Sequence, residues 1–182
     1  MDIVEKNSIA WYVLRVTYQR EIAASKALEE LQVEHYVPTI KTRIRNDKGV
    51  SIGWKVEPLV HNYIFVHDTY ENILRLKQGK LDYLRFIMGK GSNGLMSEPQ
   101  YVPEKQMADF MKVVRTMGFK PVDPNIDLRK GDRVRVLTGP FEGVEGIFIK
   151  MPTRHEKRVV IKIEGIAAVA TMALNASDIE KI

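Results

Sequence analysis

The sequence contains no cysteine, and this absence excludes several classes of protein. Without thiols the chain has no disulfide framework, no cysteine-ligated zinc or iron–sulfur site and no thiol nucleophile. Long apolar runs are missing too: the longest, residues 167–174, falls far short of the ~20 residues that span a bilayer. The first ten residues carry Asp2 and Glu5 and lack the basic-then-apolar order of a signal peptide. We therefore expect a soluble, cytoplasmic protein that does not bind a membrane.

The charge balance is only mildly basic, which limits what it says about partners. The 182 residues include 28 Lys and Arg against 23 Asp and Glu, a net charge of +5. This excess is too small to coat a polyanion by charge alone, although a local basic patch could still contact nucleic acid. Solubility is the simpler explanation of the overall charge. With 45% hydrophobic residues, the chain has the composition of an ordinary globular protein.

A change of pattern near the middle of the chain predicts two domains. Residues 118–127 contain two prolines and a glycine and few large apolar side chains, which is typical of an exposed connection. Strand-like and helix-like segments alternate before it, and strand-like segments alone follow it. We predict a first domain over 1–117, a linker over 118–128 and a second domain over 129–182.

The first domain is predicted to be an α+β fold, with helices packed on an antiparallel sheet. Its helices show apolar residues at i, i+3, i+4 and i+7, as at Ala24, Ala27, Leu28 and Leu31. A capping-box pattern beginning at Asp68 predicts the start of another helix. In chain order we expect strand 11–16, helix 20–33, extended residues 35–40, hairpin 40–57, strand 63–67, helix to 78, strand 81–88 and a helix from 103.

The second domain is predicted to be a small, strongly bent all-β barrel. About 55 residues with four or five short strands are enough for such a fold. Gly131, Gly139 and Gly146 fall at the strand ends, where a small barrel bends sharply. The expected strands are 133–137, 146–151, 158–163 and 167–173, with a polar hairpin tip over 152–157.

A basic hairpin is one candidate functional feature. Lys41, Arg43 and Arg45 alternate along one strand and so share a face, and Lys48 lies in the predicted turn. Such a stripe could lie along a phosphate backbone. The same charges would also protect an exposed strand from pairing with another edge. Both interpretations stay open.

An enzyme is the less favoured function. The strand pattern predicts that His61 and His67 point to the same face, but a metal site would need a further ligand. No G-x-S-x-G, Walker A or H-E-x-x-H pattern is present, and the glycine-rich segment 89–94 has the wrong order for a phosphate loop. We predict a protein without catalytic residues, metal or cofactor.

A set of aromatic residues is a second candidate feature. Tyr63 and Phe65 share a strand face, and Trp11, Tyr12 and Phe86 lie on neighbouring predicted strands. Packing in the core is the usual role of such side chains. If they lie on the sheet face away from the helices, they form an exposed apolar patch and imply a protein partner.

Several segments resemble the NusG family of transcription elongation and antitermination factors. Residues 11–13 (WYV), 36–39 (YVPT) and 58–66 (PLVHNYIFV) are similar to the family's NGN domain, and 130–147 resembles a KOW motif of SH3-like barrels. The order of the two halves makes the resemblance fairly specific, and it covers nearly the whole chain. Two positions depart from the family pattern: His61 replaces a proline, and Asn62 replaces the glycine of the general factor.

The resemblance implies a mechanism without bond chemistry. The NGN domain of the family docks on the clamp helices of RNA polymerase through an apolar patch, holds the clamp closed and reduces pausing and termination. By position, Tyr63 and Phe65 match patch residues, with Tyr12 and Phe86 as further members. The overall pattern is most similar to UpxY-like antiterminators of capsular polysaccharide operons. We expect a monomer.

The resemblance also places the other candidate residues. The four hairpin cations would lie near upstream DNA, the non-template strand or the nascent RNA. The KOW barrel of the family recruits a second partner such as Rho or a ribosomal protein, and Phe141 and Ile147 are its candidate contacts or else barrel core. One specialised relative can refold this domain into helices. Residues 158–163 are β-branched and alternating, so we predict no such switch here.

Two other functions compete with this interpretation. One is a KOW-containing RNA-binding or ribosome-associated protein that does not contact polymerase, and a polymerase pull-down separates it from an elongation factor. The other is an enzyme that uses His61 and His67, which predicts a bound metal.

Overall fold

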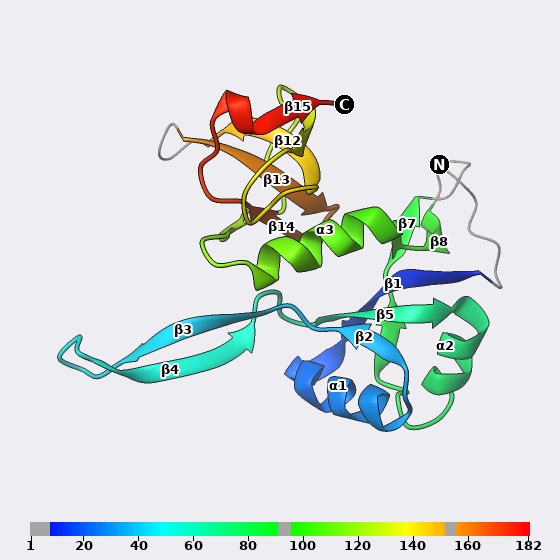
Figure 1. Cartoon of the computed structure of the whole chain (residues 1–182). Helices are drawn as coiled ribbons and strands as arrows, with labels where there is room; N and C mark the ends of the chain where they lie inside the picture. The colour runs from blue at the N-terminus through cyan, green and yellow to red at the C-terminus, as the bar shows by residue number, and fades with distance from the viewer. Residues whose placement is uncertain (1–7, 91–95, 152–155) are drawn as a thin grey trace. The chain divides into compact units, whose positions relative to one another are not determined.

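In a computed structural model, which describes residues 8–90, 96–151 and 156–182, the chain forms two compact units (Figure 1). The units are Met1–Glu104 and Lys105–Ile182. Helix α3 (Glu104–Arg115) therefore groups almost entirely with the second unit. The sequence pattern placed this helix in the first domain, with the boundary after residue 117, so the contacts divide the chain earlier than predicted.

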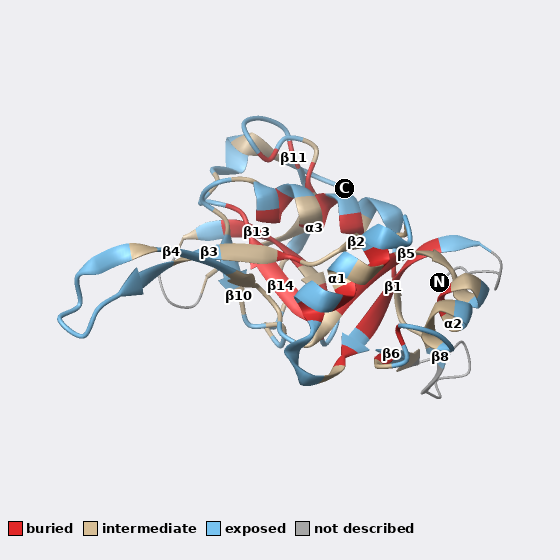
Figure 2. Ribbon diagram, turned by 90° about the horizontal axis from the view of Figure 1, so that it is seen from below, coloured by how far each residue is buried: buried red, intermediate tan, exposed pale blue. Residues whose placement is uncertain are grey.

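The first unit is built on an antiparallel sheet with the strand order β2-β5-β1-β6, and β9 pairs with β1 as well. Trp11 to Val16 was predicted as a strand from its aromatic and β-branched residues, and β1 confirms it. Five consecutive residues of β1 are buried, so both faces of this strand are covered (Figure 2). The strands are β1 (Ile9–Val16), β2 (Glu34–Tyr36), β5 (Tyr63–Thr69), β6 (Leu84–Phe86) and β9 (Tyr101–Val102).

Helices α1 (Glu21–Glu30) and α2 (Tyr70–Lys77) supply apolar side chains to one face of this sheet. Ala24 and Leu28 of α1 form one buried cluster with residues of β1 and β5, as the spacing of apolar residues predicted. The start of α2 lies one residue later than predicted. The side chain of Thr69, not of Asp68, accepts the capping hydrogen bond from the Asn72 amide (3.2 Å). A one-turn 3-10 helix, η1 (Thr17–Gln19), precedes α1.

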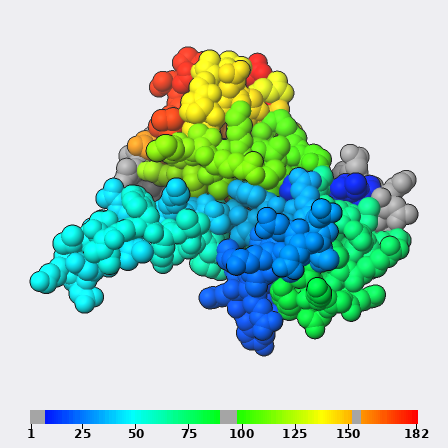
Figure 3. Space-filling model, turned by 60° about the horizontal axis from the view of Figure 1, so that its bottom comes forward, coloured from blue at the N-terminus to red at the C-terminus, as the bar shows by residue number. Residues whose placement is uncertain are grey.

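Two hairpins of the first unit form separate two-stranded sheets. Strands β3 (Thr39–Arg45) and β4 (Ser51–Pro58) confirm the predicted hairpin over 40–57. This hairpin projects from the body of its unit as an arm, drawn in cyan in Figure 3. The other pair is β7 (Met88–Lys90) and β8 (Met96–Pro99). The predicted glycine-rich turn 89–94 lies mostly outside the described residues, and Gly89 and Lys90 belong to β7.

The second unit contains a six-stranded antiparallel sheet in the order β10-β14-β13-β12-β11-β15, which agrees with the predicted α+β fold and second all-β part. Part of the predicted linker is in fact β10, since Lys120 to Val122 pairs with β14. The pattern missed this strand because Pro121 and the flanking polar residues read as a connection. The tip 152–155 lies outside the described residues. The remaining strands are β11 (Asp132–Val136), β12 (Glu145–Lys150), β13 (Lys157–Ile163), β14 (Ala167–Ala170) and β15 (Ile179–Lys181), with the 3-10 helix η2 (Ala176–Asp178).

Hydrogen bonds join α3 to the loop between β11 and β12 within the second unit. Asp109 is nearly fully buried, and its carboxylate accepts from the Lys105 ammonium (2.6 and 2.7 Å) and from the Glu145 amide (3.1 Å). The Lys105 and Lys112 ammonium groups also donate to the carbonyls of Gly143 and Glu142. These bonds give the physical reason why α3 groups with the second unit.

Candidate nucleic-acid and protein-binding surfaces

The hairpin β3–β4 carries its cations on one face, as predicted. Arg43 lies directly opposite Trp54, and Lys41 lies opposite Val56. Directly paired residues of an antiparallel ladder share a face. The Arg43 guanidinium lies 5.0 Å from the centroid of the Trp54 ring, which confirms this arrangement. Alternation along β3 adds Arg45 to the same face.

The turn at the tip of this hairpin is held by a short polar side chain. The Asn46 carboxamide oxygen accepts from the amides of Lys48 (3.1 Å) and Val50 (2.9 Å), and Gly49 has a φ of 76°. The Arg45 guanidinium donates to the Gly49 carbonyl (2.9 Å). Arg45 therefore supports the turn, whereas Lys41, Arg43 and Lys48 form no ion pair within the described residues.

The opposite face of the hairpin is close to neutral. Its Lys55 ammonium lies 2.5 Å from the Glu57 carboxylate. The hydrogen bond from Lys55 lowers the pKa of Glu57. Because this cation is paired and the cations of the Arg43 face are not, the two faces differ in charge.

Three apolar residues of β4 are exposed and were not among the predicted site residues. Ile52, Trp54 and Val56 keep 63%, 60% and 63% of their surface exposed. Trp54 and Val56 lie among the cations, and Ile52 lies at a bulge in the ladder. Because tryptophan side chains usually lie in the core, the residue type did not indicate an exposed position here. The alternation of Ile52, Trp54 and Val56 opposite a basic strand was the signal that could have found it.

The four aromatic residues expected to form one patch lie on two faces of the main sheet. Tyr12 and Phe86 lie on the face of α1 and α2, where their ring centroids are 5.8 Å apart and Tyr70 packs against both. Tyr12 is buried, and burial, with the nearby phenol of Tyr70, raises the pKa of its own phenol. Tyr63 and Phe65 lie on the other face. The expectation of a single patch is therefore wrong, because successive strand residues face opposite ways.

On that other face, Phe65 is fully buried and Tyr63 is half-buried. Tyr63 lies opposite Arg15, which is exposed. The Tyr36 ring lies 6.5 Å from the Phe65 ring and is half-buried as well. Arg15, Tyr36 and Tyr63 thus lie on the same face of the sheet as the buried Phe65 and form a polar-aromatic surface beside it.

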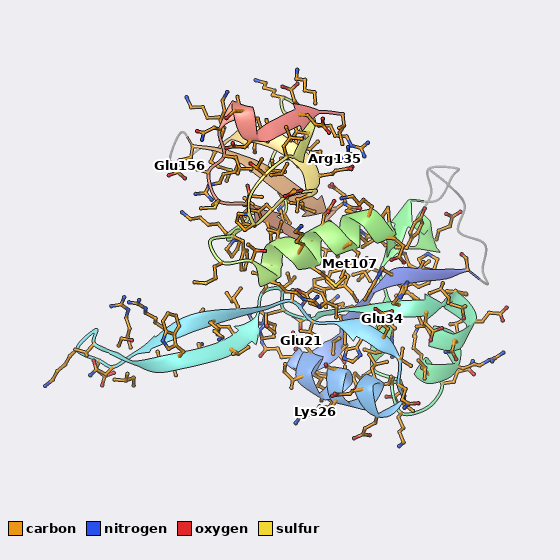
Figure 4. All side chains as sticks on the ribbon, viewed as in Figure 1. Glu21, Lys26, Glu34, Met107, Arg135 and Glu156 are labelled. Atoms are coloured by element: carbon orange, nitrogen blue, oxygen red, sulfur yellow. The ribbon has the colours of Figure 1, made fainter. Side chains whose placement is uncertain are left out.

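His67 lies between two carboxylates. Its Nδ1 is 2.5 Å from a Glu34 oxygen and its Nε2 is 2.6 Å from a Glu104 oxygen. Figure 4 labels Glu34 on β2. Burial lowers the pKa of His67, but the hydrogen bonds and charges of the two carboxylates outweigh burial and raise it. No local sequence pattern indicates this cluster, because its three members are distant in the chain.

The predicted pairing of His61 and His67 on one face is wrong. β5 begins only at Tyr63. Asn62, between His61 and the strand, has a φ of 67°, so the alternation of strand faces does not extend back to His61. The residues that the structure describes contain no group of His, Asp and Glu that could hold a metal ion. No helix within these residues is long and apolar enough to cross a membrane.

The two candidate contact residues of the second unit differ in exposure. Phe141 is fully buried, so the structure places it in the core rather than on a surface. Ile147 of β12 is half-buried. A salt-bridge network lies on the same sheet, where Arg135 contacts Glu145 (2.9 Å) and Glu180 (3.1 Å).

Comparison with known proteins identifies the family. The model of a family described as "Transcription termination factor nusG" matches residues 9–111, from the first residue of β1 into α3. The chain belongs to the NusG family. The transcription elongation factor Spt5 of Acidianus ambivalens is 25% identical over 153 residues, which are 84% of this chain and 81% of that protein. The solved structure "Domain interaction in Thermotoga maritima NusG" aligns over 98% of this chain and 99% of its own, at 21% identity and a TM-score of 0.46.

Proposed function

We propose that this NusG-family protein is an elongation and antitermination factor that docks on the clamp helices of RNA polymerase in the cytoplasm. The main support for the proposal is the family match over residues 9–111. These residues include the main sheet, α1, α2 and the β3–β4 hairpin. Docking holds one conformation of the polymerase through differential binding, and no bond is made or broken.

The docking surface that the geometry supports best is the one formed by Arg15, Tyr36 and Tyr63. Arginine and tyrosine are enriched among residues that dominate protein interfaces. Phe65 lies on the same face, is fully buried, and supports the surface without touching the partner. Tyr12 and Phe86 face α2 instead, and we assign them to the core of the unit.

Further contacts extend the proposal. The cations Lys41, Arg43 and Lys48 contact nucleic acid beside the polymerase, and Arg45 holds the tip in place. Ile147 of the second unit contacts a further partner, such as Rho or a ribosomal protein. We also propose an UpxY-like specialisation for polysaccharide operons, which genome-wide mapping of the bound sites in the host would test.

Transcription by the purified host polymerase tests this function. Added full-length protein is expected to shorten the dwell time at pause sites and to increase read-through of a terminator. Tyr63→Ala, which removes the exposed aromatic of the surface, is expected to lose both effects. Unchanged pausing and read-through with folded wild-type protein would contradict the proposal.

A further inference from the structure

Strand β4 has an open edge that its own side chains leave unprotected. Among the described residues β4 pairs with β3 alone, so the backbone groups along its outer edge face no other strand. Proteins usually protect such an edge with charged side chains. The stripe of cations on this hairpin belongs to β3, whereas β4 exposes the apolar residues Ile52, Trp54 and Val56. An edge of this composition favours pairing with a further strand.

The charges of β4 indicate which strand can pair with it. Its two charged residues, Lys55 and Glu57, are of opposite sign and lie two positions apart on one face. Two copies of this segment can run antiparallel about the residue between them, Val56. Lys55 of each copy then lies directly opposite Glu57 of the other copy. The segment is therefore complementary in charge to a second copy of itself.

We propose that two copies of this chain form a dimer through β4, paired antiparallel about Val56 into one four-stranded sheet β3-β4-β4-β3. The contact is closed by a two-fold axis, because each copy contributes the same strand. Val56 lies opposite Val56 of the second copy, and Trp54 lies opposite Pro58 of the second copy. The inference goes beyond the proposed function and replaces the monomer that the family resemblance implies.

Neighbouring registers are less favourable. Centring the pair on Lys55 or on Glu57 places a charge directly opposite its own copy, which is destabilising. Centring it on Trp54 places Lys55 opposite Gly53, which offers no ionic partner. A slip of one residue brings Lys55 and Glu57 of one copy onto the face of Trp54 and Val56 of the other. The register about Val56 keeps opposite charges together on one face and apolar side chains on the other.

The basic residues of β3 do not oppose this pairing. The two β3 strands are outermost in the four-stranded sheet, three strand spacings or about 14 Å apart. This distance exceeds the Debye length of about 8 Å at physiological ionic strength, so salt largely screens the cations of one copy from those of the other. Trp54 and Val56 lose contact with water on pairing, which favours the dimer. Because the paired segment is short, we expect a Kd on the order of 100 µM.

Sedimentation and cross-linking of the full chain test the dimer. The mass measured by sedimentation should rise from one chain toward two between about 10 and 500 µM, a range that brackets the expected Kd. The protein has no cysteine, so Val56→Cys introduces a single thiol at the two-fold axis. Mild oxidation should link this variant into a covalent dimer. Ser51→Cys is the control, because its two thiols lie roughly 30 Å apart in the dimer and should not be linked.

Charge exchange tests the register. Lys55→Glu places two acidic residues opposite each other at both ends of the pair, and Glu57→Lys places two basic residues there. Each variant alone should associate at least tenfold more weakly than wild type, whereas an equimolar mixture of the two should recover the association. Recovery in the mixture also shows that both variants are folded. Lys41→Gln, on the outermost strand, should dimerise as wild type does.

Three results would overturn the inference. The first is a wild-type protein with the mass of one chain at every concentration. The second is a Val56→Cys variant that is linked no faster than Ser51→Cys. The third is a mixture of the Lys55 and Glu57 variants that associates no better than either alone. Tyr63→Ala should dimerise normally, and these assays contain no polymerase, so failure here is distinguishable from failure of polymerase docking.

Discussion

The Trp11 indole lies flat on the His67 imidazole, with ring centroids 4.7 Å apart and planes inclined by 11°. The same indole donates a hydrogen bond to Glu104 (3.2 Å), and the imidazole bonds Glu104 through its Nε2. A neutral imidazole has one N–H and so can donate to one of its two carboxylate partners. The geometry is therefore that of an imidazolium, and the cluster joins Glu104, the first residue of α3, to β1, β2 and β5.

This cluster predicts a pH-dependent stability. The pKa of His67 is raised in the folded state, so its stabilisation is complete below the unfolded value of about 6.5 and is lost as pH rises through the higher folded pKa. Both carboxylates are largely exposed, so we expect about 1 kcal/mol. Urea unfolding at pH 6 and pH 9 measures it. His67→Gln should abolish the difference, and the control His61→Gln, in the exposed turn, should not.

The backbone conformation of Asn62, just before β5, is expected to make the stability of the protein sensitive to the residue at this position. Its φ of 67° is left-handed, its amide donates to the buried Glu21 carboxylate, and its carbonyl accepts from Val16 (2.8 Å). Asn62→Ala should lower the free energy of unfolding by about 1 kcal/mol, because alanine lacks the short polar side chain that lets asparagine adopt the left-handed conformation. Asn62→Gly should stay within about 0.5 kcal/mol of wild type. Equal losses in both variants, by urea unfolding, would show that the amide side chain matters instead.

Gly146 predicts a close approach of two strands in the second unit. A Cβ there would lie 2.6 Å from the Val160 carbonyl oxygen, a backbone atom that cannot rotate away. Gly146→Ala should cost about 2 kcal/mol or more, as overpacking does. At Gly79 a Cβ would meet its nearest atom at 3.8 Å, so Gly79→Ala is the control and should be neutral. Thermal unfolding compares the two, and similar melting temperatures would contradict the predicted packing.

The buried carboxylate of Asp109 is expected to stabilise the packing of α3 against the start of β12. Asp109→Ala leaves the Glu145 amide without its acceptor and removes both contacts to the Lys105 ammonium. We expect a loss of about 1–3 kcal/mol in thermal or urea unfolding. Lys112→Met removes an exposed bond to a loop carbonyl and should cost less than about 1 kcal/mol. The prediction fails if Lys112→Met is the more damaging of the two.

Most elements of the fold could be predicted from local pattern. Apolar spacing indicated α1 and α3, and alternation with an Asn-Asp-Lys-Gly turn indicated the β3–β4 hairpin. The short strand β10 could not be found, because three residues with a proline become a strand only by pairing with β14. The grouping of α3 with the second unit could not be predicted either, since it depends on hydrogen bonds that join Asp109 and two lysines to residues 30 to 38 positions away in the chain.

In the candidate sites too, local pattern predicted some features, whereas others depend on tertiary contacts. Strand periodicity was enough to place Lys41, Arg43 and Arg45 on one face. It could not show that Phe65 is fully buried, because burial depends on what covers the sheet and not on alternation. Trp54 is the converse case: its type indicates core, and only the isolated hairpin leaves it exposed.

Binding of the full chain to the isolated clamp-helix hairpin of the host RNA polymerase, measured by calorimetry, tests the central claim most directly. We predict micromolar or tighter binding that Tyr63→Ala weakens roughly thirtyfold, a loss of ~2 kcal/mol typical of an anchoring aromatic. Phe86→Leu, on the opposite face of the sheet, should leave the affinity unchanged. Folded wild-type protein that does not bind the clamp hairpin, or equal losses in both variants, would contradict docking through the Tyr63 surface.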